Sequence, residues 1–85
     1  LDNATLASLF SWSESEFNTR LEGSPIRRIG YQRWLRNIAV ALGNSRRTTE
    51  VVAILEEKKT EATPMVREHI EWAIARLNEH SAEAV

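Results

Sequence analysis

The residues of this chain most suited to bind a ligand are arginines, and they gather in its middle third. Seven of them lie between positions 20 and 47 beside a single acid, Glu22, and they are Arg20, Arg27, Arg28, Arg33, Arg36, Arg46 and Arg47. The guanidinium group pairs with phosphate and carboxylate groups through a planar fork of donors, so such a cluster indicates a polyanionic partner. Salt bridges to the acidic C-terminal half of the chain are the alternative interpretation, and the charge pattern leaves both open.

Catalytic and metal-binding patterns are absent from the sequence. Nucleophilic catalysis needs a side chain activated by a base, and the two histidines, His69 and His80, have no spacing that gathers a metal ion. The chain has no cysteine, which excludes disulfides, thiolate chemistry and Cys-ligated iron–sulfur clusters within it. We therefore expect no catalytic residue, metal ligand or cofactor in this chain, with His69 as an ordinary helix residue. The acidic pairs are expected on solvent-exposed helix faces beside basic neighbours: Glu56 and Glu57 with Lys58 and Lys59, and Glu68 and Glu71 with Arg67.

Length and composition are those of one ordinary globular domain over residues 1–85. The chain is 42% hydrophobic and 27% charged, which provides apolar side chains for a single core. No uncharged run approaches the roughly 20 apolar residues that span a bilayer, and no secretion leader occurs, so no membrane association is expected. The chain starts at Leu1 rather than at Met, which suggests a piece of a longer protein.

Apolar residues recur at helical spacing along the chain, and this pattern predicts an all-α fold of about five helices. Ser13 with Glu16 forms a capping box, and Ser24 followed by Pro25 is a helix start. The predicted segments are a short first turn around residues 6–10, a second helix from Ser13, a third over 25–42, a fourth from Thr48 or Thr49 that frays at 56–59, and a fifth from 64 that frays at 81–85.

The third predicted helix, over 25–42, has two faces. Its apolar side holds Tyr31, Trp34, Leu35, Ile38, Ala41 and Leu42, and its polar side holds Gln32, Arg33, Arg36 and Asn37. Gly30 inside this helix costs about 1 kcal/mol relative to alanine, so we expect another backbone or a ligand to approach it closely, and helix packing is the favoured reason. Gly43 is expected to end the helix with a positive φ. Trp34 and Trp72 are expected in the core, and Trp12 between the first turn and the second helix.

The polar side of this helix, together with the arginines at its two ends, is the best candidate binding site. One turn separates Arg33 from Arg36, and such a stripe tracks phosphates through contacts that salt weakens and that do not read sequence. Folded RNA, read by shape through its backbone and 2′-hydroxyls, is a suitable ligand. In the alternative, Arg36 or Arg67 is buried as a link between helices. The predicted RNA-binding residues are Arg27, Arg28, Gln32, Arg33, Arg36, Asn37, Arg46 and Arg47.

A weak internal repeat relates the third and fifth helices. Residues 35–39 and 66–70 share an apolar residue followed by an arginine, then two variable residues and a further apolar residue, at an offset of 31 positions. Helix pairs stacked at such a period form an α-solenoid. A helical bundle without repeats would give a similar pattern, so both architectures stay open.

Residues 23–44, GSPIRRIGYQRWLRNIAVALGN, closely resemble the C-terminal region of epoxyqueuosine reductase. The flanks agree, since Leu9-Phe10 with Trp12, Glu16 and Phe17 is similar to that family's lead-in, and residues 66–73 resemble its closing HEAT-like helix. The resemblance covers residues 5–77. The residues of the binding face that match the family's motif are Arg27, Arg28, Arg33, Arg36 and Asn37, and their RNA contacts are inferred from the helix wheel alone.

The resemblance implies an enzyme of tRNA modification that reduces epoxyqueuosine to queuosine at the wobble position, using cobalamin and two 4Fe-4S clusters. Those cofactors would belong to a cobalamin-binding domain and a ferredoxin-like domain outside this chain, in a cytoplasmic enzyme. This chain would be the HEAT-like C-terminal domain, with residues 1–22 as lead-in helices and 23–80 as the repeat core. Its expected partners are the anticodon region of tRNA and the catalytic and ferredoxin-like domains of the same polypeptide, and we expect a monomer. The alternative is a helical-repeat module that packs against other protein domains without touching RNA.

Overall fold

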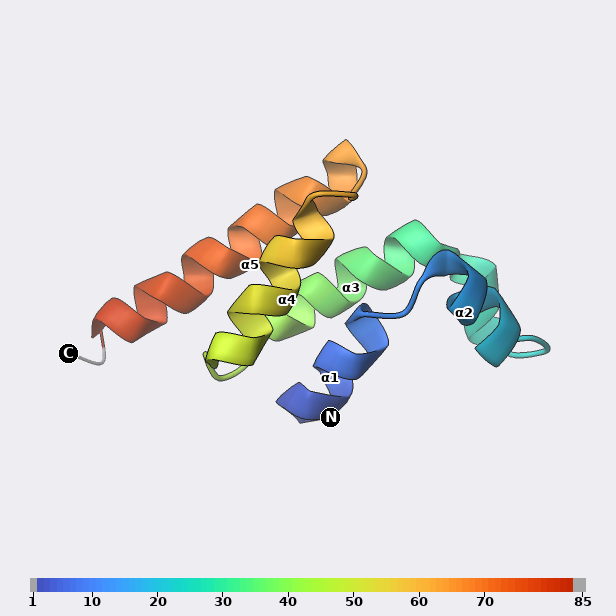
Figure 1. The fold of residues 1–85 in the computed structure, drawn as a ribbon, viewed down its shortest axis with the longest axis horizontal. Coiled ribbons are helices and arrows are strands. Elements are labelled where there is room, and N and C mark those ends of the chain that lie inside the picture. The colour runs from blue at the N-terminus through green and yellow to red at the C-terminus, as the bar shows by residue number, and fades with distance from the viewer. Residues whose placement is uncertain (1, 84–85) are drawn as a thin grey trace.

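The structure is a computed structural model that describes residues 2–83, with side chains described up to Glu79. Within these residues the chain folds into five α-helices and one short 3₁₀-helix, with no strand (Figure 1). They are α1 (Asn3–Phe10), α2 (Glu14–Arg20), η1 (Pro25–Ile29), α3 (Tyr31–Gly43), α4 (Thr49–Lys59) and α5 (Pro64–Glu83). The prediction of an all-α fold of about five helices is confirmed.

Helix α3 lies at the centre of the fold and packs against α1 and α5. In Figure 1, α4 returns along the direction opposite to α3, and α5 then runs in the same direction as α3. Residues on α3 or at its end bind residues at the start and in the body of α5, and the two partners are separated by a nearly constant number of positions in the sequence. The Thr63 hydroxyl donates to Gln32, 31 positions earlier, and Arg76 donates to Asn44, 32 positions earlier. This is the offset of the weak sequence repeat, as expected for two equivalent helices stacked side by side. The assignment to HEAT-like repeats stays a prediction.

The core forms where the apolar stripes of α1, α3, α4 and α5 meet. Residues three and four positions apart share one helix face, so each helix contributes a short row of side chains. The largest fully buried core side chains on these helices are Phe10, Leu42, Val51, Leu55, Val66, Ile70 and Leu77. Of the core residues predicted on α3, Leu35, Ile38 and Leu42 are buried, whereas Tyr31, Trp34 and Ala41 lie half-buried at the edge.

The helix starts follow the side chains that cap them. Ser13 Oγ accepts from the backbone N–H of Glu16 at 3.1 Å, and the Glu16 carboxylate accepts from the N–H of Ser13 at 3.2 Å, which confirms the capping box. Thr48 caps α4 in the same way by accepting from Val51. At α1 the N–H of Thr5 donates to Asp2, and this hydrogen bond lowers the pKa of the Asp2 carboxyl.

Two predicted helix ends are wrong. Helix α4 does not fray over 56–59 but continues to Lys59, and α5 continues to Glu83, beyond the fraying expected from Ser81. Residues 84 and 85 of that predicted frayed end lie outside the described residues. The end of α4 is retained because its penultimate residue, Lys58, is held by tertiary contacts that local propensity does not reveal.

The helix predicted over 25–42 is divided at Gly30 into η1 and α3. Gly30 has φ 88° and ψ 154°, a backbone conformation that is essentially restricted to glycine, and no atom lies within 4 Å of the position a Cβ would take. Its role is therefore conformational, and the expected close approach of a backbone is wrong.

The close approach occurs at Gly43 instead, where an added Cβ would lie 2.7 Å from Trp72 Cζ3 and 2.9 Å from the Cα of Ala73. Gly43 belongs to α3 and does not have the positive φ expected of it.

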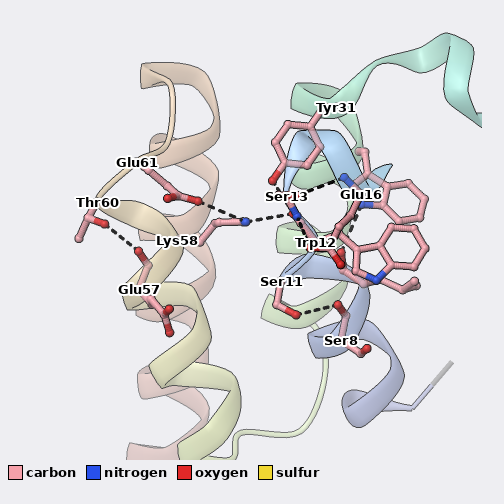
Figure 2. Close-up of polar contacts among 12 residues, drawn as sticks. Ser8, Ser11, Trp12, Ser13, Glu16, Tyr31, Glu57, Lys58, Thr60 and Glu61 are labelled. Carbon is pink, nitrogen blue, oxygen red and sulfur yellow. Dashed lines mark hydrogen bonds and ion pairs between the residues drawn. The ribbon is translucent and has the colours of Figure 1, made fainter. Parts of the chain in front are cut away.

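Lys58 is the one charged residue buried within the described part of the chain. Figure 2 shows its side chain reaching from α4 to the segment between α1 and α2, where Nζ donates to the carbonyl oxygen of Trp12 at 3.1 Å. The same nitrogen lies 3.3 Å from the Glu61 carboxylate and 5.7 Å from the centre of the Tyr31 ring. The Tyr31 hydroxyl donates to the same Trp12 carbonyl. Lys58 thus ties α4 to the N-terminal helices and pairs with Glu61 rather than with the expected Glu56 or Glu57.

Replacing Lys58 with methionine is expected to lower the free energy of unfolding by about 1–2 kcal/mol. Methionine keeps an apolar stem of similar length but removes a charge-assisted hydrogen bond, worth roughly 1.5–3 kcal/mol, while Tyr31 still satisfies the Trp12 carbonyl. Urea unfolding measures the change, with Lys59→Met as the matched neighbour expected to shift stability by less than about 0.5 kcal/mol. Equal effects of the two substitutions would contradict a structural role for the Lys58 contacts.

The aromatic residues between α1 and α3 form one cluster. Trp12 stacks on Trp34 with ring centroids 5.6 Å apart and planes inclined by 15°, and Phe17 packs obliquely on Tyr31 and Trp34. The Arg20 guanidinium lies 5.2 Å above the Trp12 ring. The expected packing of Trp12 between the first turn and the second helix is therefore corrected: its stacking partner, Trp34, belongs to α3, which is distant in sequence.

Candidate nucleic-acid interface

The polar side of α3 carries a short row of basic and amide side chains. Arg33 and Asn37 are exposed, and Arg36 is half-buried. Arg36 donates from Nε and Nη2 to Oδ1 of Asn37, at 3.3 and 3.1 Å. Because residues three and four positions apart are neighbours on a helix surface, the structure brings these three side chains together.

The arginines of the candidate face are not neutralised by carboxylates in the described part of the chain. The two ion pairs found there join Arg20 to Glu16 at 3.9 Å and Lys58 to Glu61 at 3.3 Å. The alternative of salt bridges between the arginine-rich helix and the acids of α5 finds no support among these residues. Arg67 is exposed, so it is not a buried link between helices.

Several arginines are instead oriented by neutral amide oxygens. Arg27 donates to Asn18 Oδ1 of the preceding helix at 3.4 Å, and Arg47 donates to Asn78 Oδ1, 31 positions later, at 3.4 Å. An amide oxygen accepts a hydrogen bond from the guanidinium without cancelling its charge. These arginines therefore stay charged and able to pair with a polyanion, and they lose part of their conformational freedom.

Gln32 does not join this group. Its Oε1 accepts from the Thr63 hydroxyl at 3.2 Å, and the side chain lies half-buried against the start of α5. The helix wheel placed Gln32 with the arginines because it ignores the neighbouring helix, which covers that edge of α3. Gln32 therefore binds the connection before α5 rather than the solvent-facing stripe.

The remaining predicted residues lie at the two ends of α3. Arg27 and Arg28, with residues 23–25, line a shallow hollow of about 470 Å³ on η1. Arg46 and Arg47 are exposed in the α3–α4 connection, where the backbone carbonyl of Arg46 accepts from the Asn3 amide at 2.6 Å. A helix of this length spans about 20 Å, so the predicted residues form a band along α3 and not a single pocket.

Two residues of α5 extend this band and were missed in the sequence. Trp72, expected in the core, is 42% exposed, and the Arg76 guanidinium lies 5.7 Å from the centre of its ring. Nε of Arg76 donates to Asn44 Oδ1 at 2.8 Å, which ties the pair to the end of α3. Arg76 lies outside the arginine-rich block, so only the stacking of α5 on α3 reveals that it shares this surface.

The side chains that could ligate a metal ion are dispersed in the part of the chain that the structure describes. No group of three or more histidine, cysteine or acidic residues that could hold a metal occurs there, and a chain without cysteine does not fit the thiolate ligation of a 4Fe-4S cluster. His69 is a half-buried helix residue whose Nδ1 contacts the carbonyl oxygen of Met65 at 2.8 Å, and the side chain of His80 lies outside the described residues. None of the described helices is both long and apolar enough to cross a membrane.

Comparison with known proteins identifies relatives over most of the chain. The epoxyqueuosine reductase of Pseudomonas aeruginosa is 56% identical over 79 residues, which is 93% of this chain and 22% of that enzyme. The enzyme of Xanthomonas campestris is 55% identical over 76 residues, covering 89% of this chain and 21% of its own length, and that of Escherichia coli is 55% identical over 71 residues, covering 84% and 18%. This chain is homologous to a C-terminal segment of the epoxyqueuosine reductases. It spans about a fifth of the length of those relatives.

The resemblance to epoxyqueuosine reductase seen in residues 23–44 is thereby confirmed. In the structure, those residues build η1, the Gly30 turn and α3, the elements that carry most of the candidate interface. No protein-family model matches the chain, and no solved structure matches it.

Proposed function

We propose that this chain is the tRNA-binding part of an epoxyqueuosine reductase and contributes no catalytic group of its own. The observation that carries the proposal is the band of arginines along α3, which lack carboxylate partners among the described residues while amide oxygens orient several of them. Polyanion binding is the most direct use of such a band, because no carboxylate in the described part of the molecule lies within ion-pair distance of it.

In the parent enzyme, the reaction would be reduction of epoxyqueuosine to queuosine at the wobble position of tRNA. Cobalamin and two 4Fe-4S clusters would supply that chemistry from the catalytic and ferredoxin-like domains of the same polypeptide, in the cytoplasm. This chain would act as a monomeric domain over residues 1–85 that holds the tRNA so that its anticodon reaches the active site.

Each part of the interface has a distinct task in this proposal. Arg33 and Arg36 bind backbone phosphates, and Asn37 presents an amide to a sugar 2′-hydroxyl. The arginines at the two ends of α3 extend the contact, and the packed helices fix the orientation of the bound RNA. Contacts of this kind recognise shape and charge more than sequence.

A salt titration tests the proposal. An anticodon stem-loop with the sequence G-U-N is titrated against the chain at 50 and 200 mM salt. If about four arginines bind phosphates, a fourfold rise in salt weakens binding on the order of 100-fold. Absence of binding at 50 mM, or an affinity that does not change with salt, would contradict RNA binding by the arginine band.

Packing against other domains of the parent is a second candidate function, favoured by apolar side chains on η1. Ile26 is 47% exposed and Ile29 is 39% exposed, and residues 23–25 with Arg27 and Arg28 line a hollow on the same element. The surface around Phe10 and Trp12 does not serve this purpose, because Phe10 is fully buried and Trp12 stacks on Trp34. The salt titration separates the two functions, since a packing module does not require RNA affinity.

A further inference from the structure

Trp72 has an environment that differs from those of the other two tryptophans. Trp12 and Trp34 stack on each other, whereas Trp72 stands on α5 with 42% of its surface exposed. One edge of its ring rests over Gly43, where the missing side chain lets α5 approach α3. The ring is thus anchored at one edge while much of its surface stays accessible.

The surroundings of Trp72 differ on its two sides along α5. One turn after it, the Arg76 guanidinium lies 5.7 Å from the ring centre and is held by its hydrogen bond to Asn44. On the other side, Glu68 and His69, about one turn before Trp72, line a shallow hollow of about 290 Å³ together with Val40 of α3 and Trp72 itself. A cation fixed near an aromatic ring and a hollow beside that ring make a slot for one further planar group.

We propose that Trp72 is a stacking site for an unpaired nucleobase of the RNA bound by this chain. This inference rests on the proposed function, and it adds a second kind of contact to the same surface. Aromatic side chains bind the bases of single-stranded RNA regardless of sequence, because every base has a π-face. The hollow is shallow and lies beside the exposed ring, so a base could rest against the indole at the surface.

The charges around the hollow favour one orientation of the bound nucleotide, with its base in the hollow and its phosphate directed toward α3. Arg76 and the arginines of α3 lack carboxylate partners in the described residues, so they attract the phosphate. Glu68 at the rim repels phosphate but accepts hydrogen bonds from the amino and imino groups of bases. His69 Nδ1 is bonded to a carbonyl oxygen, which can only accept, so Nδ1 donates there and Nε2 is the ring nitrogen left to face a base.

The test compares two RNAs and two substitutions in the whole 85-residue chain. One RNA is the anticodon stem-loop, and the other is its stem as a blunt duplex without unpaired bases. Trp72→Leu is expected to weaken binding of the stem-loop roughly 5- to 150-fold, the range that loss of one base stack produces, and to leave duplex binding unchanged. Trp72→Phe, which keeps an aromatic face, is expected to retain most of the affinity. Met65→Leu is the control for an exposed apolar residue on the same helix.

A measurement on the unsubstituted chain keeps the proposal testable if Trp72→Leu does not fold. Stacking of a base is expected to shift the indole N–H resonance of Trp72 upfield when the stem-loop is added, with little change for Trp12 and Trp34. Equal affinities of the leucine variant and the original chain, or an unshifted resonance, would overturn base stacking.

The outcome for Trp72 is distinguishable from failure of RNA binding itself. If substituting the α3 arginines weakens binding of both RNAs and Trp72→Leu changes neither, then only the stacking site is wrong. If Trp72→Leu instead abolishes association with the catalytic part of the parent enzyme while RNA affinity is unchanged, then this face is a protein interface and the proposal is overturned.

Discussion

The double substitution Arg33→Glu and Arg36→Glu is expected to weaken binding of the anticodon stem-loop on the order of 100-fold. Two charge-assisted hydrogen bonds at about 1.5 kcal/mol each account for a change of that size. The slope of log affinity against log salt concentration is expected to decrease in magnitude by about two, since each arginine that binds a phosphate contributes about one to that slope. Fluorescence or NMR titration at two salt concentrations measures both effects.

The fold is expected to survive this substitution. Arg33 is exposed and Arg36 donates only to its neighbour Asn37, so neither side chain holds two helices together. The control is Lys59→Glu with Arg67→Glu, which changes net charge equally at residues of α4 and α5. If both pairs weakened RNA binding to the same extent, net charge and not the α3 face would account for affinity.

Gly43→Val is expected to destabilise the fold by about 3 kcal/mol, through the close contact of α3 with α5. A Cβ at this position would lie 2.7 Å from Trp72 Cζ3 and 2.9 Å from the backbone Cα of Ala73. The tryptophan ring can move, but the backbone of α5 can do so only by separating the helices, and overpacking of this kind typically costs about 1–3 kcal/mol or more. Helix propensity opposes the effect only weakly, because valine is a slightly better helix residue than glycine.

Thermal unfolding measures this prediction. A loss of about 3 kcal/mol lowers Tm by roughly 12–24 °C in a domain of this size. Ala53→Val is the matched control, because Ala53 is an exposed residue within α4, and its replacement is expected to cost only about 0.5 kcal/mol through helix propensity. If Gly43→Val lowered Tm by no more than Ala53→Val does, the helices would not be in close contact at Gly43.

Much of the fold could be predicted because helix starts and apolar stripes are local properties. The capping box at Ser13 and Glu16, the cap at Ser24 and the cap at Thr48 each involve residues within a few positions of one another. The helix ends were less predictable. Helix α4 persists through residues that look like a frayed end because Lys58 binds the carbonyl of Trp12, 46 positions away in the sequence.

The candidate site was predicted in part, and its errors have the same origin. Arg33, Arg36 and Asn37 share a face because helix geometry alone places them together. Gln32 was placed on that face by the same geometry, but its side chain is held by Thr63, which precedes another helix. Trp72 and Arg76 were missed because a helix wheel for one helix cannot show which surface a neighbouring helix completes.

By itself, the sequence determined the class of the fold, the residues that begin its helices, the charge of its middle third and its kinship with the epoxyqueuosine reductases. The tertiary structure alone decided what the two central glycines do. Gly30 turns the chain at a positive φ, and Gly43 lets two helices touch, the reverse of the roles expected from their positions. The physical reason is that backbone conformation and helix contact depend on where the packed elements lie, and no local pattern contains that information. The same packing places an exposed tryptophan and a further arginine beside the arginine band.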